Sequence, residues 1–145
     1  MVSRKHTTTV AETELEALRR YRTQGSLALS AYLDLRSSER QAAAEDLLAE
    51  RIQASLHELG IDGEQRASLQ EDVELIQIYL STNGNRKAAG VAVFSCAEEL
   101  FWRAYLLPLP VDMRVHVGPE LDVEPLLDVL ERNRCESFSP EQVAV

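Results

Sequence analysis

The sequence predicts an α+β fold, in which a four-stranded, mostly antiparallel or mixed sheet is covered by helices. Three observations lead to this prediction. Short apolar runs of strand length occur at 27–35, 90–95, 100–107 and 113–117. Two long amphipathic segments, joined by a short glycine-containing turn, lie between the first and second runs. Shorter helical patterns flank the arrangement at both ends, which gives the order α-β-α-α-β-β-β-α.

The first helix and the first strand have clear local signals. A capping box opens the helix, because Thr9 can cap it and Glu12 can reach back to the cap. Leu15 and Leu18 then fall on one face of the helix. Residues 27–35 carry apolar side chains at nearly every position, which is typical of a central strand buried on both faces.

The long αα-hairpin opens at a second capping box, with Ser38 as the predicted cap. The apolar stripe of its first helix follows three-to-four spacing and consists of Leu48, Ile52, Leu56 and Leu59. The stripe of the partner helix consists of Leu69, Val73, Ile76 and Leu80. The turn between them, which forms the hairpin tip, is Gly60, Ile61, Asp62 and Gly63.

The C-terminal segments complete the sheet and cover it. Residues 113–117 alternate apolar and polar side chains, as an edge strand with one exposed face does. A flanking C-terminal helix is expected from about Asp122, with a stripe of Leu126, Leu127 and Leu130.

Length and composition fit one domain. The chain has 145 residues, of which 45% are hydrophobic and 27% charged, as in globular proteins. We interpret residues 1–11 as a flexible basic arm, 12–138 as a single domain, and 139–145 as a tail or the start of a next domain. No apolar run approaches the roughly 20 residues that span a bilayer, and no secretory signal is recognisable. We therefore expect a cytoplasmic protein without membrane contact.

The charge is unevenly distributed. A net charge of −9 and a pI near 4.8 argue against a free-standing nucleic-acid binder, because neutralised phosphates supply most of that affinity. Residues 1–40 nevertheless carry +2, and the remainder carries −11. Any contact with a polyanion must therefore use the first third of the chain. The candidate RNA-contact residues there are Arg19, Arg20, Arg22, Arg36 and Arg40. The structural alternative is a solvated helix face on which Glu16 pairs with Arg20.

Nothing in the sequence predicts catalysis, a metal or a cofactor. No glycine-rich phosphate loop or nucleophile motif occurs, and His6, His57 and His116 have no nucleophile or carboxylate at motif spacing. Cys96 and Cys135 lack metal-ligand spacing, and we expect two reduced thiols rather than a disulfide.

Two acidic clusters also have a structural interpretation. The runs Glu71-Asp72-Glu74 and Glu98-Glu99 are predicted to be solvated faces rather than acid/base pairs.

Six segments, taken in order, carry a resemblance to a known family. They are residues 30–35 (Ser-Ala-Tyr-Leu-Asp-Leu), 71–80, 89–95 (Ala-Gly-Val-Ala-Val-Phe-Ser), 107–110 (Leu-Pro-Leu-Pro), 116–118 and 124–127. The ordered set resembles the N-terminal domain of bacterial and archaeal proteins similar to the eukaryotic and archaeal class 1 peptide chain release factor, over about residues 12–133. The resemblance implies a ribosome-associated protein in translation termination, rescue or hibernation.

The chain departs from that family at its functional motifs. Codon-reading members carry Asn-Ile-Lys-Ser at the hairpin tip, whereas this chain has Gly-Ile-Asp-Gly at 60–63, and an aspartate there would repel RNA phosphate. The Tyr-x-Cys-x-x-x-Phe element is absent, and so is the Gly-Gly-Gln loop, which belongs to the family's next domain. We therefore expect a non-catalytic domain that does not read stop codons.

Two other classes of function stay open. An acidic protein-interaction or regulatory module, as a monomer or a homodimer, would explain the net charge of −9 by contact with a basic protein. A small hydrolase would need a histidine beside a serine or cysteine in a closed cleft. The partner expected first is the ribosome, and the alternative is a protein partner or a second copy.

Overall fold

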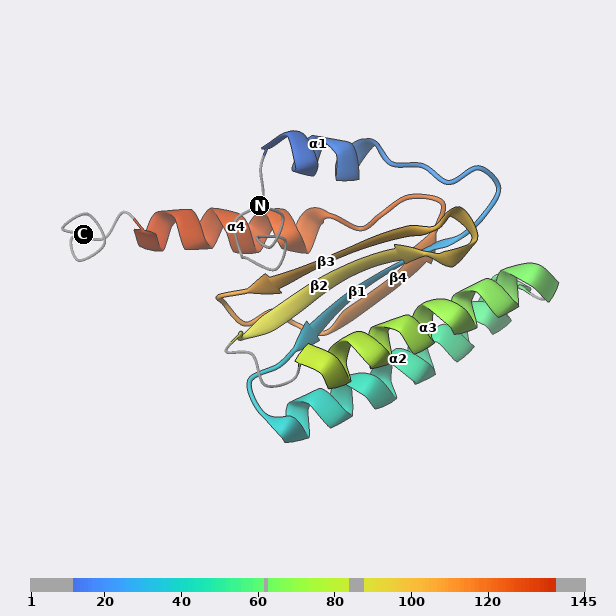
Figure 1. Cartoon of the computed structure of the whole chain (residues 1–145), viewed down its shortest axis with the longest axis horizontal. Helices are drawn as coiled ribbons and strands as arrows, with labels where there is room; N and C mark the ends of the chain where they lie inside the picture. Colours follow the sequence, from blue (N-terminus) through green and yellow to red (C-terminus); the bar gives the residue numbers. More distant parts are fainter. Residues whose placement is uncertain (1–11, 62, 84–87, 138–145) are drawn as a thin grey trace.

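The computed structural model describes residues 12–61, 63–83 and 88–137, and for residues 38, 41, 44, 83 and 133–137 it describes the backbone only. Its elements follow the predicted order (Figure 1): α1 (Glu12–Arg20), β1 (Ala28–Asp34), α2 (Ser38–Glu58), α3 (Gly63–Asn83), β2 (Gly90–Cys96), the short 3₁₀ turn η2 (Ala97–Glu99), β3 (Phe101–Leu107), β4 (Arg114–Gly118) and α4 (Glu124–Ser137). The predicted α+β class and αα-hairpin are confirmed. The expected basic arm and C-terminal tail lie outside the described residues.

The sheet is antiparallel in all three of its pairings. Its strand order is β3-β2-β1-β4, so β1 lies between two neighbours and β4 lies at an edge. Ala31 of β1, for example, is paired with Val93 on one side and Val115 on the other. All seven residues of β1 are buried. The predictions of a doubly covered central strand and of an edge strand near 113–117 are therefore confirmed.

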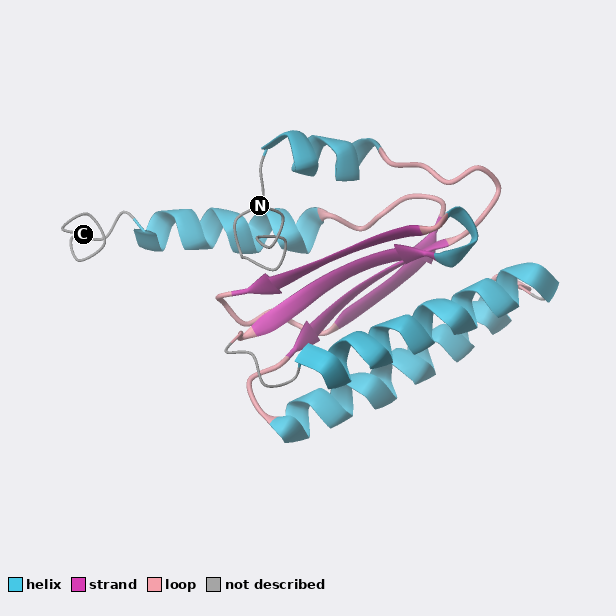
Figure 2. Cartoon of the chain, in the orientation of Figure 1, coloured by secondary structure: helices cyan, strands magenta, loops and turns pink. Residues whose placement is uncertain are grey.

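Helices cover both faces of the sheet (Figure 2), and side chains pack in two separate cores, one on each face. Alternate side chains of a strand point to opposite faces, so β1 contributes to both. Leu33 faces α2 and α3 and belongs to a cluster with Leu48 and Ile76. Tyr32 faces α1 and α4 and packs with Phe94 and Leu126 in a second cluster.

The cap of α2 is Ser37, not the predicted Ser38. The hydroxyl of Ser37 accepts the N–H of Arg40 at 3.1 Å, and its backbone is extended, with φ −150° and ψ 162°. Ser38 already belongs to the helix. Two adjacent serines are equally good caps by residue type, and the extended backbone that an N-cap needs decides between them.

The apolar stripe of α2 ends at Leu56, three residues earlier than predicted. Leu59 follows the last helical residue as the C-cap and is 56% exposed. Ile61 fills the place expected for Leu59, because it is 6% exposed and its N–H donates to the carbonyl of Leu56 at 2.9 Å. The turn thus folds a residue of the hairpin tip back onto the core.

Asp72 is buried, and its predicted place on a solvated face is wrong. Glu71 and Glu74 are exposed as expected, but Asp72 has no exposed surface. It lies three residues after Leu69 and four before Ile76, which places it on the buried stripe of α3. Its Oδ1 accepts the hydroxyl of Ser95 at 2.5 Å and the N–H of Ala97 at 2.9 Å.

These contacts join α3 to the end of β2 and to η2. Loss of hydration on burial raises the pKa of the Asp72 carboxyl to about 6, against the opposing effect of its two hydrogen bonds.

Asp72→Asn should change how stability depends on pH. The native carboxyl binds its proton more tightly than the unfolded one, so its ionisation lowers the free energy of unfolding as pH rises from about 4 to about 6. The loss is on the order of 2 kcal/mol, and the asparagine variant should not show it. Urea unfolding at a series of pH values measures this slope. Glu71→Gln, an exposed neighbour, is the control and should keep the wild-type slope; an unchanged slope in Asp72→Asn would contradict the assignment.

Leu100, between η2 and β3, has a strained backbone and an exposed side chain. Its φ of 55° and ψ of 36° lie in the left-handed region, which glycine and asparagine tolerate better than leucine. The residue is 93% exposed, so burial of its side chain does not offset the strain. The turn from β2 to β3 therefore keeps Leu100 in a backbone conformation that is unfavourable for leucine.

Leu100→Asn should raise the free energy of unfolding by about 1 kcal/mol, because it relieves the left-handed strain and removes almost no packing. Chemical denaturation of the two proteins measures the difference. Leu59→Asn is a suitable control, since Leu59 is also exposed but has an ordinary φ of −91°. Equal effects of the two substitutions would show that backbone strain is not the cause.

Candidate functional site

The five candidate arginines lie at two opposite ends of the sheet. Arg22 lies before β1 begins, and Arg36 and Arg40 follow after β1 ends. β1 lies between Arg22 and the second group, and its seven residues are roughly 23 Å long at about 3.3 Å per residue. The candidates therefore do not form one continuous patch.

The first group lies at the C-terminal end of α1 and is open to solvent. Arg20 pairs with Glu16 at 3.0 Å, the predicted contact between positions four apart on the helix. Arg22 donates to the carbonyls of Arg19 and Tyr21 at 3.1 and 2.7 Å, and its Nε lies 3.8 Å from Glu120. The side chain of Arg20 is 78% exposed and that of Arg22 is 57% exposed. These contacts are surface pairs that a stronger anion could replace.

The second group is held by Asp34, the last residue of β1. Its carboxylate accepts Nη2 of Arg36 at 2.7 Å and Nη1 of Arg40 at 3.2 Å, and its Oδ1 also accepts the Arg36 N–H at 3.0 Å. Asp34 is 4% exposed, and its hydrogen bond with the Arg36 guanidinium is the main reason that its pKa is lowered. Arg36 and Arg40 thus satisfy a nearly buried carboxylate.

The hairpin tip is closed mainly by backbone conformation. Gly60 and Gly63 have φ values of +63° and +65°, in the left-handed region that glycine adopts without strain. Ile61 points inward, as described above, and Asp62 lies outside the described residues. None of the described residues of the tip carries a charge.

Two histidines lie beside shallow hollows. His57, near the end of α2, lines a hollow at the hairpin tip together with Leu56 and Arg66. His116 of β4 lines another, together with Arg19 and Glu120. The described residues that line these two hollows include no serine or cysteine.

The described residues form neither a metal-binding cluster nor a membrane-spanning helix. It contains no cluster of three or more His, Cys, Asp or Glu side chains that could hold a metal ion. None of its helices is long and apolar enough to cross a bilayer. Cys96 is buried with a free thiol, and the side chain of Cys135 is not described.

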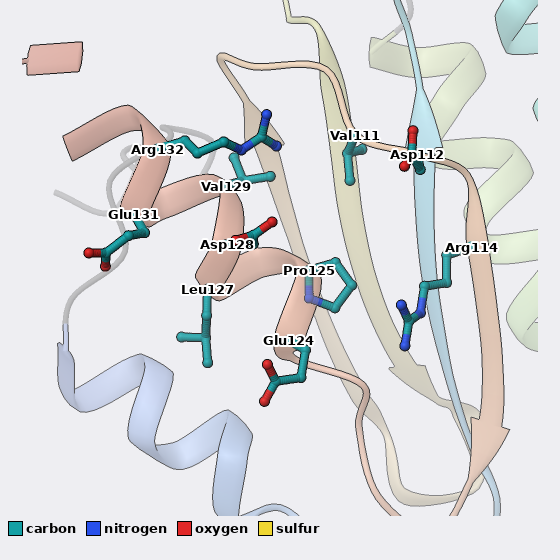
Figure 3. Close-up of a pocket in the computed structure, with 10 residues that line it drawn as sticks. All are labelled: Val111, Asp112, Arg114, Glu124, Pro125, Leu127, Asp128, Val129, Glu131 and Arg132. Carbon is teal, nitrogen blue, oxygen red and sulfur yellow. The ribbon is translucent and has the colours of Figure 1, made fainter. Parts of the chain in front are cut away.

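A hollow of about 450 Å³ lies between α4 and the segment that leads into β4 (Figure 3). Its charged lining residues are Asp112, Arg114, Glu124, Asp128, Glu131 and Arg132. Arg114 pairs with Asp122 at 2.7 Å. Binding pockets for small molecules are mostly apolar with a few polar groups, so this charged lining does not indicate a cofactor. The sequence does not indicate this hollow, because its lining residues come from separate elements and form no motif.

No family model matches this sequence, and no curated protein matches it either. Its fold is similar to the crystal structure of the archaeal translation termination factor aRF1, with a TM-score of 0.56 and 15% sequence identity. The match covers 83% of this chain and 35% of that chain, so this chain spans about a third of the length of that factor. Similarity at this identity shows a shared fold, and at that level the release-factor resemblance is confirmed.

Asp34→Asn should lower the free energy of unfolding at pH 7 by about 1–2 kcal/mol, because two guanidinium groups lose a charged acceptor. The native carboxyl has a lowered pKa, so its stabilising effect is present above pH 4 and disappears as the pH falls through the native value. Denaturation at pH 7 and pH 3 measures both effects. Glu39→Gln, an exposed acid of the same region, should change stability little; a loss as large as that of Asp34→Asn would contradict the role of Asp34.

Proposed function

We propose that this chain is a non-catalytic, cytoplasmic, ribosome-associated domain that acts in translation termination, ribosome rescue or ribosome hibernation, without reading codons. The observation that carries this proposal is the fold match to a translation termination factor over 83% of the chain. The order of elements around the αα-hairpin is the part of the sequence that resembles the N-terminal domain of release-factor-like proteins.

The end of α1 is the best candidate for contact with ribosomal RNA. Arg19, Arg20 and Arg22 are exposed, and the ion pairs of Arg20 and Arg22 are surface pairs worth at most about 1 kcal/mol each. A phosphate group could replace these pairs at little cost. Arg36 and Arg40 are weaker candidates. If they moved away from Asp34 to bind RNA, a nearly buried carboxylate would lose its ion pairs.

The hairpin tip does not suit codon reading. Residues 38–83 contain ten Asp or Glu and three Lys or Arg, a net charge of −7, which opposes contact with mRNA phosphates. The tip itself has no lysine where codon-reading relatives carry one. In this proposal the hairpin therefore faces away from the RNA.

The test is co-sedimentation of the purified chain with vacant and translating ribosomes, from about 50 to 200 mM salt. Wild-type binding should weaken as salt rises. The triple variant Arg19→Gln, Arg20→Gln, Arg22→Gln should bind much more weakly, and the slope of log affinity against log salt should flatten by about 2 to 3, since up to three phosphate contacts are lost.

A matched triple variant separates local contacts from net charge. Arg51→Gln, Arg66→Gln, Arg132→Gln removes the same charge from exposed positions elsewhere and should bind close to wild type. Circular dichroism confirms that both variants are folded. Absence of wild-type binding at 50 mM salt would contradict ribosome association. Equal binding of the two triple variants would contradict the α1 surface but not the association.

A further inference from the structure

The two helices of the αα-hairpin enclose an apolar groove on their exposed side. A hollow of about 230 Å³ lies between α2 and α3, and we call it the hairpin groove. It is lined by Ala49, Ile52, Gln53, Gln70, Val73 and Glu74. Ile52 is 3% exposed and forms its floor, whereas Ala49 is an exposed residue with a small side chain that leaves the groove open.

Exposed apolar surface continues beyond the hollow in the direction away from the hairpin tip. Ile78 lies one helical turn after Glu74 and is 60% exposed. Toward the hairpin tip, Gln53 also lines the neighbouring hollow beside Leu56. Along α2 the stretch from Ala49 to His57 is about 12 Å long at 1.5 Å per residue, which corresponds to about two turns of a docked helix.

Acidic side chains surround the groove. Glu74 lines it directly. Asp46 lies three positions before Ala49 and four positions before Glu50, so these residues share one side of α2. All three carboxylates belong to exposed residues. Arg66 is a basic residue nearby, and it lies at the tip end of the surface.

The negative charge of the hairpin indicates which kind of molecule binds in the hairpin groove. A nucleic acid would bring phosphates against a hairpin with a net charge of −7, and a second copy of the chain would bring another −7. A basic protein segment meets the opposite sign, and an amphipathic helix presents apolar side chains at the spacing that a groove between two helices accepts. We propose that the hairpin groove binds a basic amphipathic helix of a partner protein, with its apolar side on Ile52 and Val73 and its lysines or arginines beside Asp46, Glu50 and Glu74.

The probe for this proposal is a synthetic helical peptide of about 18 residues with leucines on one side and lysines and arginines on the other. The full chain, labelled at its methyl groups, is titrated with the peptide, and affinity is measured in parallel by calorimetry. The methyl signals of Ile52 and Val73 should shift and saturate below about 1 mM peptide. An acidic peptide with the same leucine pattern should not shift them.

Two variants test the groove itself. Ala49→Phe fills it and should weaken peptide binding at least about tenfold, the size expected for a residue at the centre of an interface. Ala54→Phe places the same side chain at an exposed position of α2 outside the groove and should bind as wild type. The triple variant Asp46→Asn, Glu50→Gln, Glu74→Gln should bind more weakly and should lose most of the dependence on salt.

Three outcomes would contradict the proposal. The first is the absence of a saturable shift at Ile52 and Val73, and the second is an equal effect of the two phenylalanine variants on peptide binding. The third is a shift of the same methyl signals by an RNA oligonucleotide. A shift that depends on protein concentration without peptide would instead indicate a second copy as the occupant. The assay contains no ribosome, so its outcome is independent of the ribosome proposal.

Discussion

Every residue of the two central strands, β1 and β2, is buried, and the rest of the structure follows from that constraint. A sheet buried on both faces needs a helical layer on each side. The αα-hairpin supplies one layer, and α1 with α4 supplies the other. Each layer has a core-facing stripe and an outer surface, so the outer surfaces can differ in charge while the sheet stays the same.

The length of the strands also determines which surface residues can bind the same ligand. Loops at the start of β1 and loops at its end cannot share a ligand of ordinary size, since a seven-residue strand separates them. Arg22 and Arg36 are only 14 positions apart in the sequence, yet they belong to different surfaces. Their different pairing, with the exposed Glu120 on one side and the nearly buried Asp34 on the other, gives them different roles.

The sequence predicts the element order well, because the stripes of α2 and α3 and the apolar run of β1 follow from local periodicity. Strand order is not a local property, and nothing in residues 1–40 indicates it. The separation of Arg22 from Arg36 does follow locally, because the predicted strand 27–35 lies between them. Asp72 shows an intermediate case. Its position between Leu69 and Ile76 predicts burial, but its charge and its acidic neighbours favour a solvated face, and its partner Ser95 lies 23 positions away. At the two ends of α2 the sequence pattern is less exact: the cap is Ser37 instead of Ser38, and Ile61 is buried in place of Leu59. Backbone conformation rather than residue type decides these positions.

α1 is attached to the sheet by few contacts. Leu18 is its buried side chain, and Leu15 packs beside it against the same core. Tyr105 donates a hydrogen bond to Glu14, and Tyr21, the residue after the helix, stacks on Phe101 and donates to Glu99. Such a helix can open locally at a fraction of the free energy that unfolds the sheet. A ligand that binds the arginines of α1 would therefore also hold the helix in place, and part of its binding energy would be spent on that ordering. Affinity at this end of the molecule would then depend on the anchoring of Leu18, a residue that the ligand never touches.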